Sequence, residues 1–416
     1  MGFNKKSIDQ VDIKGKRVLM RVDFNVPQDK EGNITNTKRI DATIPTIQYC
    51  IDQGAKKIIL MSHLGRPDGQ VVPKLTLEPV AKKLGEILKR EVIFLHNCVG
   101  PEVEKAVADA ADGSIILLEN VRFHPEEEGS AVIDGKKVKA DPEKVKEFRA
   151  SLTRLGDVYV NDAFGTVHRA HSTMVGVDLP VKVSGFLVKK ELGYFTKAFD
   201  HINRPYLGIL GGAKVADKIP IINNFLEKVD QLIICGGMAY TFLAASKDMK
   251  IGKSLFDASK VDMCKELLKK AEDKKVEILL PFDFVCADKF GEDANTQVVT
   301  LEQGIPDGWE GVDCGPATSA AWREKILAAK TIMWNGPAGV FEIDKFSTGT
   351  KRLCEAVAEA TEKGVLTIVG GGDTPTALKK FGLDKKVSHI STGGGASLEL
   401  LQGLPLPGVQ NLDDAE

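Results

Sequence analysis

The chain has 416 residues, of which 43% are hydrophobic and 27% charged, and its formal net charge is −2 at pH 7. This length exceeds one ordinary hydrophobic core, so we expect two domains, and the near balance of charges argues against a general polyanion-binding protein. No apolar run reaches the roughly 20 residues of a membrane span, and the seven cysteines include no CxxC pair, so we expect a cytoplasmic protein with buried, reduced thiols and with neither nucleic acid nor membrane as a partner.

Strands and helices alternate through the first half. Short aliphatic runs predict strands over residues 17–22, 57–61, 92–95 and 115–118. Helical spacing predicts helices over 40–52, over 75–90 and from about residue 101. Continuous apolar strands separated by helices indicate a parallel sheet covered on both faces.

The second half repeats this pattern. Aliphatic runs predict strands over residues 206–210, 231–235, 277–280, 331–334, 366–369 and 387–390. Between the two halves, residues 188–201 have helical spacing and could link two domains rigidly. Residues 404–408 (LPLPG) are incompatible with a helix interior, so we expect the last dozen residues to run as an extended tail.

The pattern predicts an α/β protein with two Rossmann-like domains, each a parallel sheet with helices on both faces in three αβα layers, joined by a hinge helix. We place the N-terminal domain at residues 1–186, the hinge helix at 187–202 and the C-terminal domain at 203–400. We expect the tail, residues 401–416, to pack back on the N-terminal domain.

Anion-binding side chains follow the strands of the first half. The segments that follow these strands include residues 23–27 (DFNVP), 62–67 (SHLGRP) and 119–123 (ENVRF). A later apolar run, residues 158–160, is followed by residues 161–165 (NDAFG), with His168 and Arg169 just after, and Arg39 opens the first helix. Ligands bind at the carboxyl ends of parallel strands, and guanidinium groups match phosphate and carboxylate oxygens bidentately. One such arginine could be an ordinary surface residue, but several at successive strand ends indicate a site for a small, multiply charged anion.

Glycine-rich turns follow five strands of the second half, at residues 211–214, 236–238, 335–339, 370–374 and 392–395. Glycine lets backbone amides approach a phosphate, and the following helix N-terminus favours negative charge. Such turns also occur where strands meet helices tightly. Lys214, which could neutralise a phosphate, and Asp373, which could hold Mg²⁺, favour a nucleotide site.

Two motifs of other nucleotide-binding proteins are incomplete. Residues 252–254 (GKS) resemble the end of a P-loop, but Lys247 stands where that loop requires glycine. The later glycine-rich turns have Pro375 and Leu398 in place of the last glycine of the dinucleotide fingerprint. We therefore infer neither a standard P-loop NTPase nor a dinucleotide-dependent dehydrogenase, and no cluster of Cys and His residues predicts a metal centre.

These motifs taken together resemble the phosphoglycerate kinase family. The resemblance runs in one order from about residue 8 to residue 410, and its blocks are residues 17–27, 62–67, 161–165, 211–215, 334–337 and 370–374. The family's tail usually carries a lysine near residues 403–408, where this sequence has Leu404 followed by an extra proline. The blocks of the expected active site are intact.

The resemblance also implies the site residues. The 3-phosphoglycerate site would comprise Asp23, Asn25, Arg39, His63, Arg66, Arg122 and Arg169. The MgADP or MgATP site would comprise Gly212, Ala213, Lys214, Lys218, Asn335, Glu342, Gly371, Gly372, Asp373 and Thr374, with Phe290 and Val312 near the adenine. Asp373 would be the metal ligand, and the catalytic groups would be Arg39, Lys214 and the amides of Gly371 and Gly372. For Glu342, an ordinary surface carboxylate is the alternative interpretation.

The implied activity is that of a phosphotransferase with a carboxyl group as acceptor, a monomer that reversibly transfers a phosphoryl group between 1,3-bisphosphoglycerate and ADP in glycolysis. In the reverse direction the nucleophile is a carboxylate with a pKa of about 3.5–4, which is ionised at neutral pH. No general base is required, in agreement with the lack of a Ser/His/Asp or Cys/His arrangement. Because the reacting atoms must come within about 3–3.5 Å, we expect the domains to close.

Two other classes of function stay open at this point. A nucleotide-cofactor oxidoreductase would bind NAD, although its fingerprints are missing. A non-catalytic homologue would have lost Lys214, Asp373 or Arg39, and all three are present.

Overall fold

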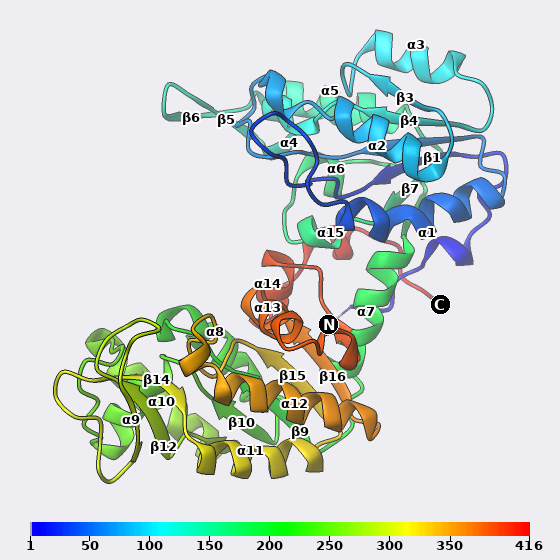
Figure 1. Cartoon of the computed structure of the whole chain (residues 1–416). Coiled ribbons are helices and arrows are strands. Elements are labelled where there is room, and N and C mark those ends of the chain that lie inside the picture. The colour runs from blue at the N-terminus through cyan, green and yellow to red at the C-terminus, as the bar shows by residue number, and fades with distance from the viewer. Residues whose placement is uncertain (1) are drawn as a thin grey trace. The chain divides into compact units, whose positions relative to one another are not determined.

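The computed structural model describes residues 2–416. These form two compact units (Figure 1): the chain up to Gly193 together with Pro405–Glu416, and Tyr194–Leu404. The boundary at Gly193 lies inside helix α7 (Phe186–Phe199). Among residues 2–416, no helix combines the length and the apolar character that crossing a membrane requires.

The first unit is built on a six-stranded parallel sheet with the order β3-β4-β2-β1-β7-β8. Its strands are β1 (Arg17–Arg21), β2 (Lys57–Met61), β3 (Val92–Leu95), β4 (Ser114–Leu118), β7 (Val158–Asn161) and β8 (Val181–Ser184). Its helices are α1 (Lys38–Asp52), α2 (Glu78–Leu88), α3 (Pro101–Asp109), α4 (Pro125–Glu128), α5 (Pro142–Thr153), α6 (Ser172–Val175) and α15 (Pro407–Gln410). A hairpin, β5 (Ser130–Ile133) and β6 (Lys136–Lys139), is added outside this sheet.

Alternating side chains of the buried strands build two cores in this unit. Met20 of β1 packs in one cluster with Ile47 of α1 and Leu84 of α2. The adjacent Leu19 packs in the other cluster, with Leu152 of α5 and with Leu412 of the tail. Because successive side chains of a strand point to opposite faces, helices cover both faces of the sheet.

The second unit repeats the architecture with the strand order β11-β10-β9-β15-β16-β17, again parallel. Its strands are β9 (Tyr206–Leu210), β10 (Gln231–Ile234), β11 (Glu277–Leu279), β15 (Thr331–Asn335), β16 (Leu366–Gly370) and β17 (His389–Ile390). Its helices are α8 (Val215–Phe225), α9 (Ala239–Lys247), α10 (Val261–Asp273), α11 (Pro316–Ala328), α12 (Thr348–Glu362), α13 (Asp373–Lys380) and α14 (Gly395–Leu401). Trp334 packs with Trp322 of α11 and Val357 of α12 on one face, while Gly208 of β9 faces Phe225 of α8 on the other.

A second, three-stranded antiparallel sheet in this unit was not predicted. It has the order β13-β12-β14 and comprises β12 (Asp283–Ala287), β13 (Thr296–Thr300) and β14 (Glu310–Cys314). Four of the five residues of β13 are exposed, so this strand lacks the apolar run that identifies a buried strand.

The expected α/β architecture, with two parallel sheets in two separate regions of the chain, is confirmed. The predicted strands of both sheets agree with the observed ones to within two residues at their ends. The cysteines are confirmed as free and buried. The expectation that the last dozen residues are extended was wrong, because α15 forms one helical turn at Pro407–Gln410. Pro407 stands at the start of this turn, where a helix needs no backbone N–H, and it therefore begins the turn instead of breaking a helix.

Candidate functional site

The loops that carry the first group of predicted residues meet beside β1. The strand order reverses its direction at β1, whose neighbours are β2 and β7, and such a switch point is where ligands bind in open α/β sheets. Asn25, after β1, accepts a hydrogen bond at Oδ1 from the backbone N–H of Gly65, after β2, at 2.8 Å. Two of the predicted segments are therefore fixed to each other.

Arg39 is anchored to this loop pair while remaining open to solvent. Its Nη1 donates to the carbonyl oxygen of Asn25 at 2.7 Å and lies 3.4 Å from Oδ1 of Asp23. The side chain is 50% exposed, against 16% for Asp23. Such a guanidinium has a defined position at the start of α1 and keeps donors available for an anion.

His63 is buried next to Arg21 and is neutral. Its Nδ1 is 3.0 Å from Nη2 of the fully buried Arg21. Because a guanidinium only donates, Nδ1 accepts and the proton of the ring sits on Nε2. Burial, followed by the positive charges of Arg21, Arg122 and Arg39, holds the pKa of His63 well below its ordinary 6.5.

The same positive field extends to His171, which the sequence did not single out. Burial, then Arg122, Arg21 and Arg169, lowers the pKa of His171 to about 3. Arg122 also donates from Nη1 to the carbonyl oxygen of Gly65 at 3.3 Å, which ties the segment after β4 to the segment after β2. Arg66 and Arg169 are exposed. The structure thus gathers Arg39, Arg122 and Arg169 around two neutral histidines.

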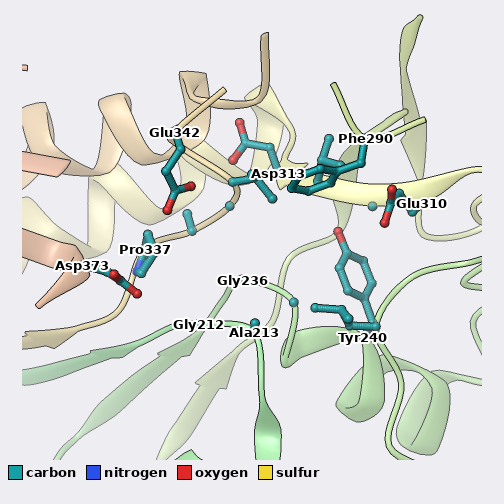
Figure 2. A pocket seen from close by; sticks show the side chains of 17 residues that line it. Gly212, Ala213, Gly236, Tyr240, Phe290, Glu310, Asp313, Pro337, Glu342 and Asp373 are labelled. Atoms are coloured by element: carbon teal, nitrogen blue, oxygen red, sulfur yellow. The ribbon is translucent and has the colours of Figure 1, made fainter. Parts of the chain in front are cut away.

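The second group of predicted residues surrounds a cavity of about 410 Å³ in the second unit (Figure 2). Among the predicted nucleotide residues, six line it: Gly212, Ala213, Phe290, Val312, Glu342 and Asp373. Gly212 and Ala213 follow β9, and the adjacent strand β15 is followed by Pro337 and Ala338, which also line the cavity. This cavity again lies where the strand order reverses.

The other predicted nucleotide residues lie outside the lining. They are Lys214, Lys218, Asn335, Gly371, Gly372 and Thr374. Lys218 donates to Oδ1 of Asn335, and burial lowers the pKa of Lys218. Thr374 accepts at Oγ1 from the N–H of Gly336 at 2.7 Å. Lys214 and Gly372 are exposed, the former just before α8 and the latter just before α13.

Two of the glycine turns interlock through their backbones. A Cβ on Gly336 would collide with the carbonyl group of Gly211, and a Cβ on Gly211 would collide with the carbonyl oxygen of Pro337. Gly336 also has a φ of 109°, which favours glycine. These two glycines are therefore required by the packing of the turns, whereas a Cβ on Gly372 would meet nothing within 4 Å.

Several lining residues were missed from the sequence. Tyr240, Leu255, Glu310 and Asp313 all line the cavity. Glu310 and Asp313 belong to β14, and that strand was not predicted, so no strand end pointed to them. Arg21 was seen only as part of a strand, because nothing in a β-strand pattern distinguishes a buried arginine from an exposed one.

Comparison with known proteins identifies the family. The family model described as phosphoglycerate kinase matches residues 8–404. The chain is 59% identical over 412 residues to the phosphoglycerate kinase of Dictyostelium discoideum, covering 99% of this chain and 98% of that protein. It is also 59% identical over 413 residues to human phosphoglycerate kinase 1, covering 99% of each.

Solved structures agree with this assignment. The structure of phosphoglycerate kinase from Coxiella burnetii is similar with a TM-score of 0.88 and 38% identity, and 98% of each chain is covered. That of phosphoglycerate kinase from Pyrococcus horikoshii has a TM-score of 0.72 and 30% identity, with the same coverage. The cavity and the arginine cluster are thus carried by a chain that, by sequence and by fold, belongs to the phosphoglycerate kinase family.

Proposed function

We propose that this chain transfers a phosphoryl group reversibly between 1,3-bisphosphoglycerate and ADP, giving 3-phosphoglycerate and ATP. The observation that carries the proposal is that one chain of this family has two sites of opposite character, each at a sheet switch point. One offers cationic side chains, and the other offers a cavity walled largely by backbone and apolar groups. These properties suit a small polyanion and a nucleotide respectively.

In this proposal the arginine cluster binds the phosphoglycerate. Arg66, Arg122 and Arg169 hold its phosphate and carboxylate groups through charge-assisted hydrogen bonds. His63, protonated on Nε2, donates one more hydrogen bond without adding a charge. Asp23 and Asn25 orient Arg39 through the contacts described above and complete the substrate site.

The nucleotide occupies the cavity with its base toward Phe290 and Val312 and its phosphates toward Gly212, Ala213 and Asp373. Glu342 contacts the ribose, while Lys218, Asn335 and Thr374 support the phosphate end of the cavity. These assignments rest on the resemblance of the motifs and on the six residues that line the cavity.

We propose Mg²⁺ as the cofactor, held by Asp373 together with the phosphates of the nucleotide. No group of three or more His, Cys, Asp or Glu side chains within residues 2–416 could hold a metal by itself. Mg²⁺ is commonly held by one or two carboxylates and substrate phosphates, and the exposed Asp373 at the start of α13 supplies such an oxygen ligand. When bound, the ion would offset the charge of the phosphates.

The transfer itself requires positioning and charge compensation, not proton abstraction. The bond between the γ-phosphorus of ATP and the oxygen of ADP breaks as a carboxylate oxygen of 3-phosphoglycerate bonds to that phosphorus. Arg39, Lys214 and the amides of Gly371 and Gly372 compensate the charge on the transferring group. Because the two substrates bind to different domains, residues 1–186 and 203–400, we propose that closure about the helix at 187–202 precedes transfer.

One chain carries both sites, so we propose a cytoplasmic monomer that needs no macromolecular partner. Sedimentation at the mass of a single 45.1 kDa chain would support the monomer. The activity is tested by a coupled assay of ATP-dependent 3-phosphoglycerate phosphorylation, with and without Mg²⁺. Turnover that requires Mg²⁺ supports the proposal, and a purified, folded protein without turnover contradicts it.

A further inference from the structure

A buried carboxylate of the first unit has no part in the proposed reaction. Glu127 belongs to the short helix α4 (Figure 1), and only 1% of the residue is exposed. Burying a charged side chain is costly unless other groups compensate the charge. Burial raises the pKa of Glu127, and the charge of Arg21 and the hydrogen bonds from Thr173 act against that shift. These two compensating residues connect Glu127 to the anion site.

Thr173 of α6 contacts both oxygens of the carboxylate and also contacts Arg21. Its backbone N–H donates to Oε1 of Glu127 at 2.8 Å, and its hydroxyl group lies 2.6 Å from Oε2. The same hydroxyl oxygen accepts from Nε of Arg21 at 2.8 Å. Because a guanidinium only donates, the proton of the hydroxyl group is left for the carboxylate. Thr173 is therefore the hydrogen-bonded link between a buried anion and a buried cation.

Arg21, at the end of β1, has an acceptor for each nitrogen of its guanidinium group. Nε donates to Thr173, Nη1 donates to the carbonyl oxygen of Val22, and Nη2 donates to Nδ1 of His63 at 3.0 Å. The guanidinium group is planar and rigid, so the bond at Nε also sets the direction of Nη2. The acceptor at Nη2 is the ring nitrogen that determines the tautomer of His63. The orientation of Arg21 thus keeps the ring proton of His63 on Nε2.

Arg21 lies among other positive charges, so its position depends on a counter-charge. Burial and Arg21 lower the pKa of Arg122, whereas Glu128 and Glu127 act in the opposite direction. The side chain of Glu128 is 31% exposed, while Glu127 is buried, so water and salt screen the charge of Glu128 more strongly. Removing the charge of Glu127 would leave the buried Arg21 less compensated and would favour its movement away from His63.

We propose that Glu127 and Thr173 are positioning residues of the anion site, which hold Arg21 so that His63 presents its Nε2 proton to the phosphoglycerate. This inference rests on the proposed function for the identity of the ligand. Glu127 acts through Thr173, and Thr173 acts through Arg21, so neither needs to touch the substrate.

The alternative is that Glu127 only joins α4 to α6. These helices have a second connection, because Oγ of Ser172 donates to the carbonyl oxygen of Glu126 at 2.6 Å. The helices should therefore stay together when the carboxylate is changed, and a positioning role can be separated from a structural one.

The first test compares Thr173→Val, which removes the hydroxyl link, with Thr173→Ser, which keeps it. Nitrogen NMR of isotope-labelled histidine reports the tautomer of His63 at pH 7.5, and His63→Gln assigns its signals. Thr173→Val should give a mixture of both tautomers. It should also raise the Kd for 3-phosphoglycerate about 10-fold in isothermal titration calorimetry. Thr173→Ser should restore the tautomer and the Kd of the parent protein.

The second test is Glu127→Gln, which keeps the shape of the side chain and removes its charge. It should raise KM for 3-phosphoglycerate about 10-fold while kcat changes little, because the contact from His63 is made equally in the ground and transition states. If Thr173→Val does not fold, the tautomer and the Kd are measured in Glu127→Gln instead.

The matched control is Tyr159→Phe, which removes a hydrogen bond of 2.7 Å from the Tyr159 hydroxyl group to the carbonyl oxygen of Thr173. This change loosens α6 but leaves the hydroxyl link, so the tautomer of His63 and the Kd should remain those of the parent protein.

Parental values in Thr173→Val and Glu127→Gln would overturn the proposal, as would equal losses in Tyr159→Phe. A parent protein that does not bind 3-phosphoglycerate would refute the proposed function, and the tautomer of His63 in the free variants would still decide whether Glu127 and Thr173 position Arg21.

Discussion

The two sites differ in what their residues contribute. Beside β1, long charged side chains from separate segments lie close together, and the side chain of Arg39 is 50% exposed. Beside β9, turns meet backbone to backbone, and Gly211 and Gly336 leave no room for a Cβ. Side chains that reach outward can be removed without disturbing the fold, whereas backbone that packs on backbone cannot be changed without disturbing it. The first site should therefore lose function without losing stability, and the second should lose both.

The largest effect is expected at Arg39. We predict that Arg39→Ala lowers kcat by about 10²–10³-fold, because it removes a preorganised cation from the transferring group. Its thermal unfolding temperature should change little, since the side chain is half exposed and its polar contacts within residues 2–416 are with Asp23 and Asn25. Steady-state kinetics and calorimetric unfolding check this pair of expectations. An unchanged kcat would remove Arg39 from the catalytic groups.

The second prediction concerns the interlocked turns. Gly336→Ala should destabilise the second unit by about 3 kcal/mol, because its Cβ collides with the backbone of Gly211 and its φ of 109° disfavours any side chain. Gly372→Ala is the matched control, since its Cβ would meet nothing within 4 Å and its φ of −93° is ordinary. Urea unfolding of both variants separates the two cases. Equal stability of the two would show that the turns are not packed as described.

A third, smaller effect separates binding from catalysis within the arginine cluster. Arg66→Ala should raise KM for 3-phosphoglycerate about 10-fold while kcat changes little, because it removes a contact made equally in the ground and transition states. Arg66 is exposed, and none of its side-chain atoms makes a hydrogen bond or ion pair within residues 2–416. The variant therefore tests ligand binding without a structural side effect. A fall in kcat at unchanged KM would assign Arg66 to the transition state instead.

The sheets and the strand-end motifs could be predicted from sequence because their signals are local. A continuous apolar run such as residues 57–61 identifies a buried strand, and whatever follows it must lie at the sheet edge. This argument located Asp23, Arg122 and Asp373 without knowledge of which strands are neighbours.

The antiparallel sheet and the residues it brings to the cavity could not be found in this way. The exposed strand β13 (TQVVT) has no continuous apolar run, and Glu310 reaches the cavity only through the pairing of β14 with β12. The turns gave a different difficulty. From the sequence, glycine in these turns was interpreted as allowing a phosphate to approach the backbone. In the structure, Gly211 and Gly336 instead allow the two turns to pack against each other. This requirement involves two distant segments, so neither segment shows it alone.

The smallest predicted effect tests whether the first site is as strongly cationic as its arginines suggest. Burial and the neighbouring arginines lower the pKa of His171 to about 3, whereas an unfolded histidine has a pKa of about 6.5. Between these values the unfolded chain binds a proton that the folded chain does not, so His171 reduces stability as the pH falls below about 6.5. His171→Gln removes this penalty. When the pH is lowered from 7.5 to 5, the free energy of unfolding of His171→Gln should therefore rise by about 1–2 kcal/mol relative to that of the parent protein.

The effect of His171 must be measured as the difference in unfolding free energy between His171→Gln and the parent protein. Other buried groups change the stability of both proteins with pH, and in the opposite direction. Burial raises the pKa of Asp162 and of Asp313 to about 7, and these carboxyls lose stabilising protons as the pH rises. Those contributions cancel when each variant is compared with the parent protein at the same pH. His201→Gln, at an exposed histidine, is the control and should show no such gain. If His171→Gln also shows none, burial and the neighbouring arginines do not hold His171 in its neutral form in the folded protein.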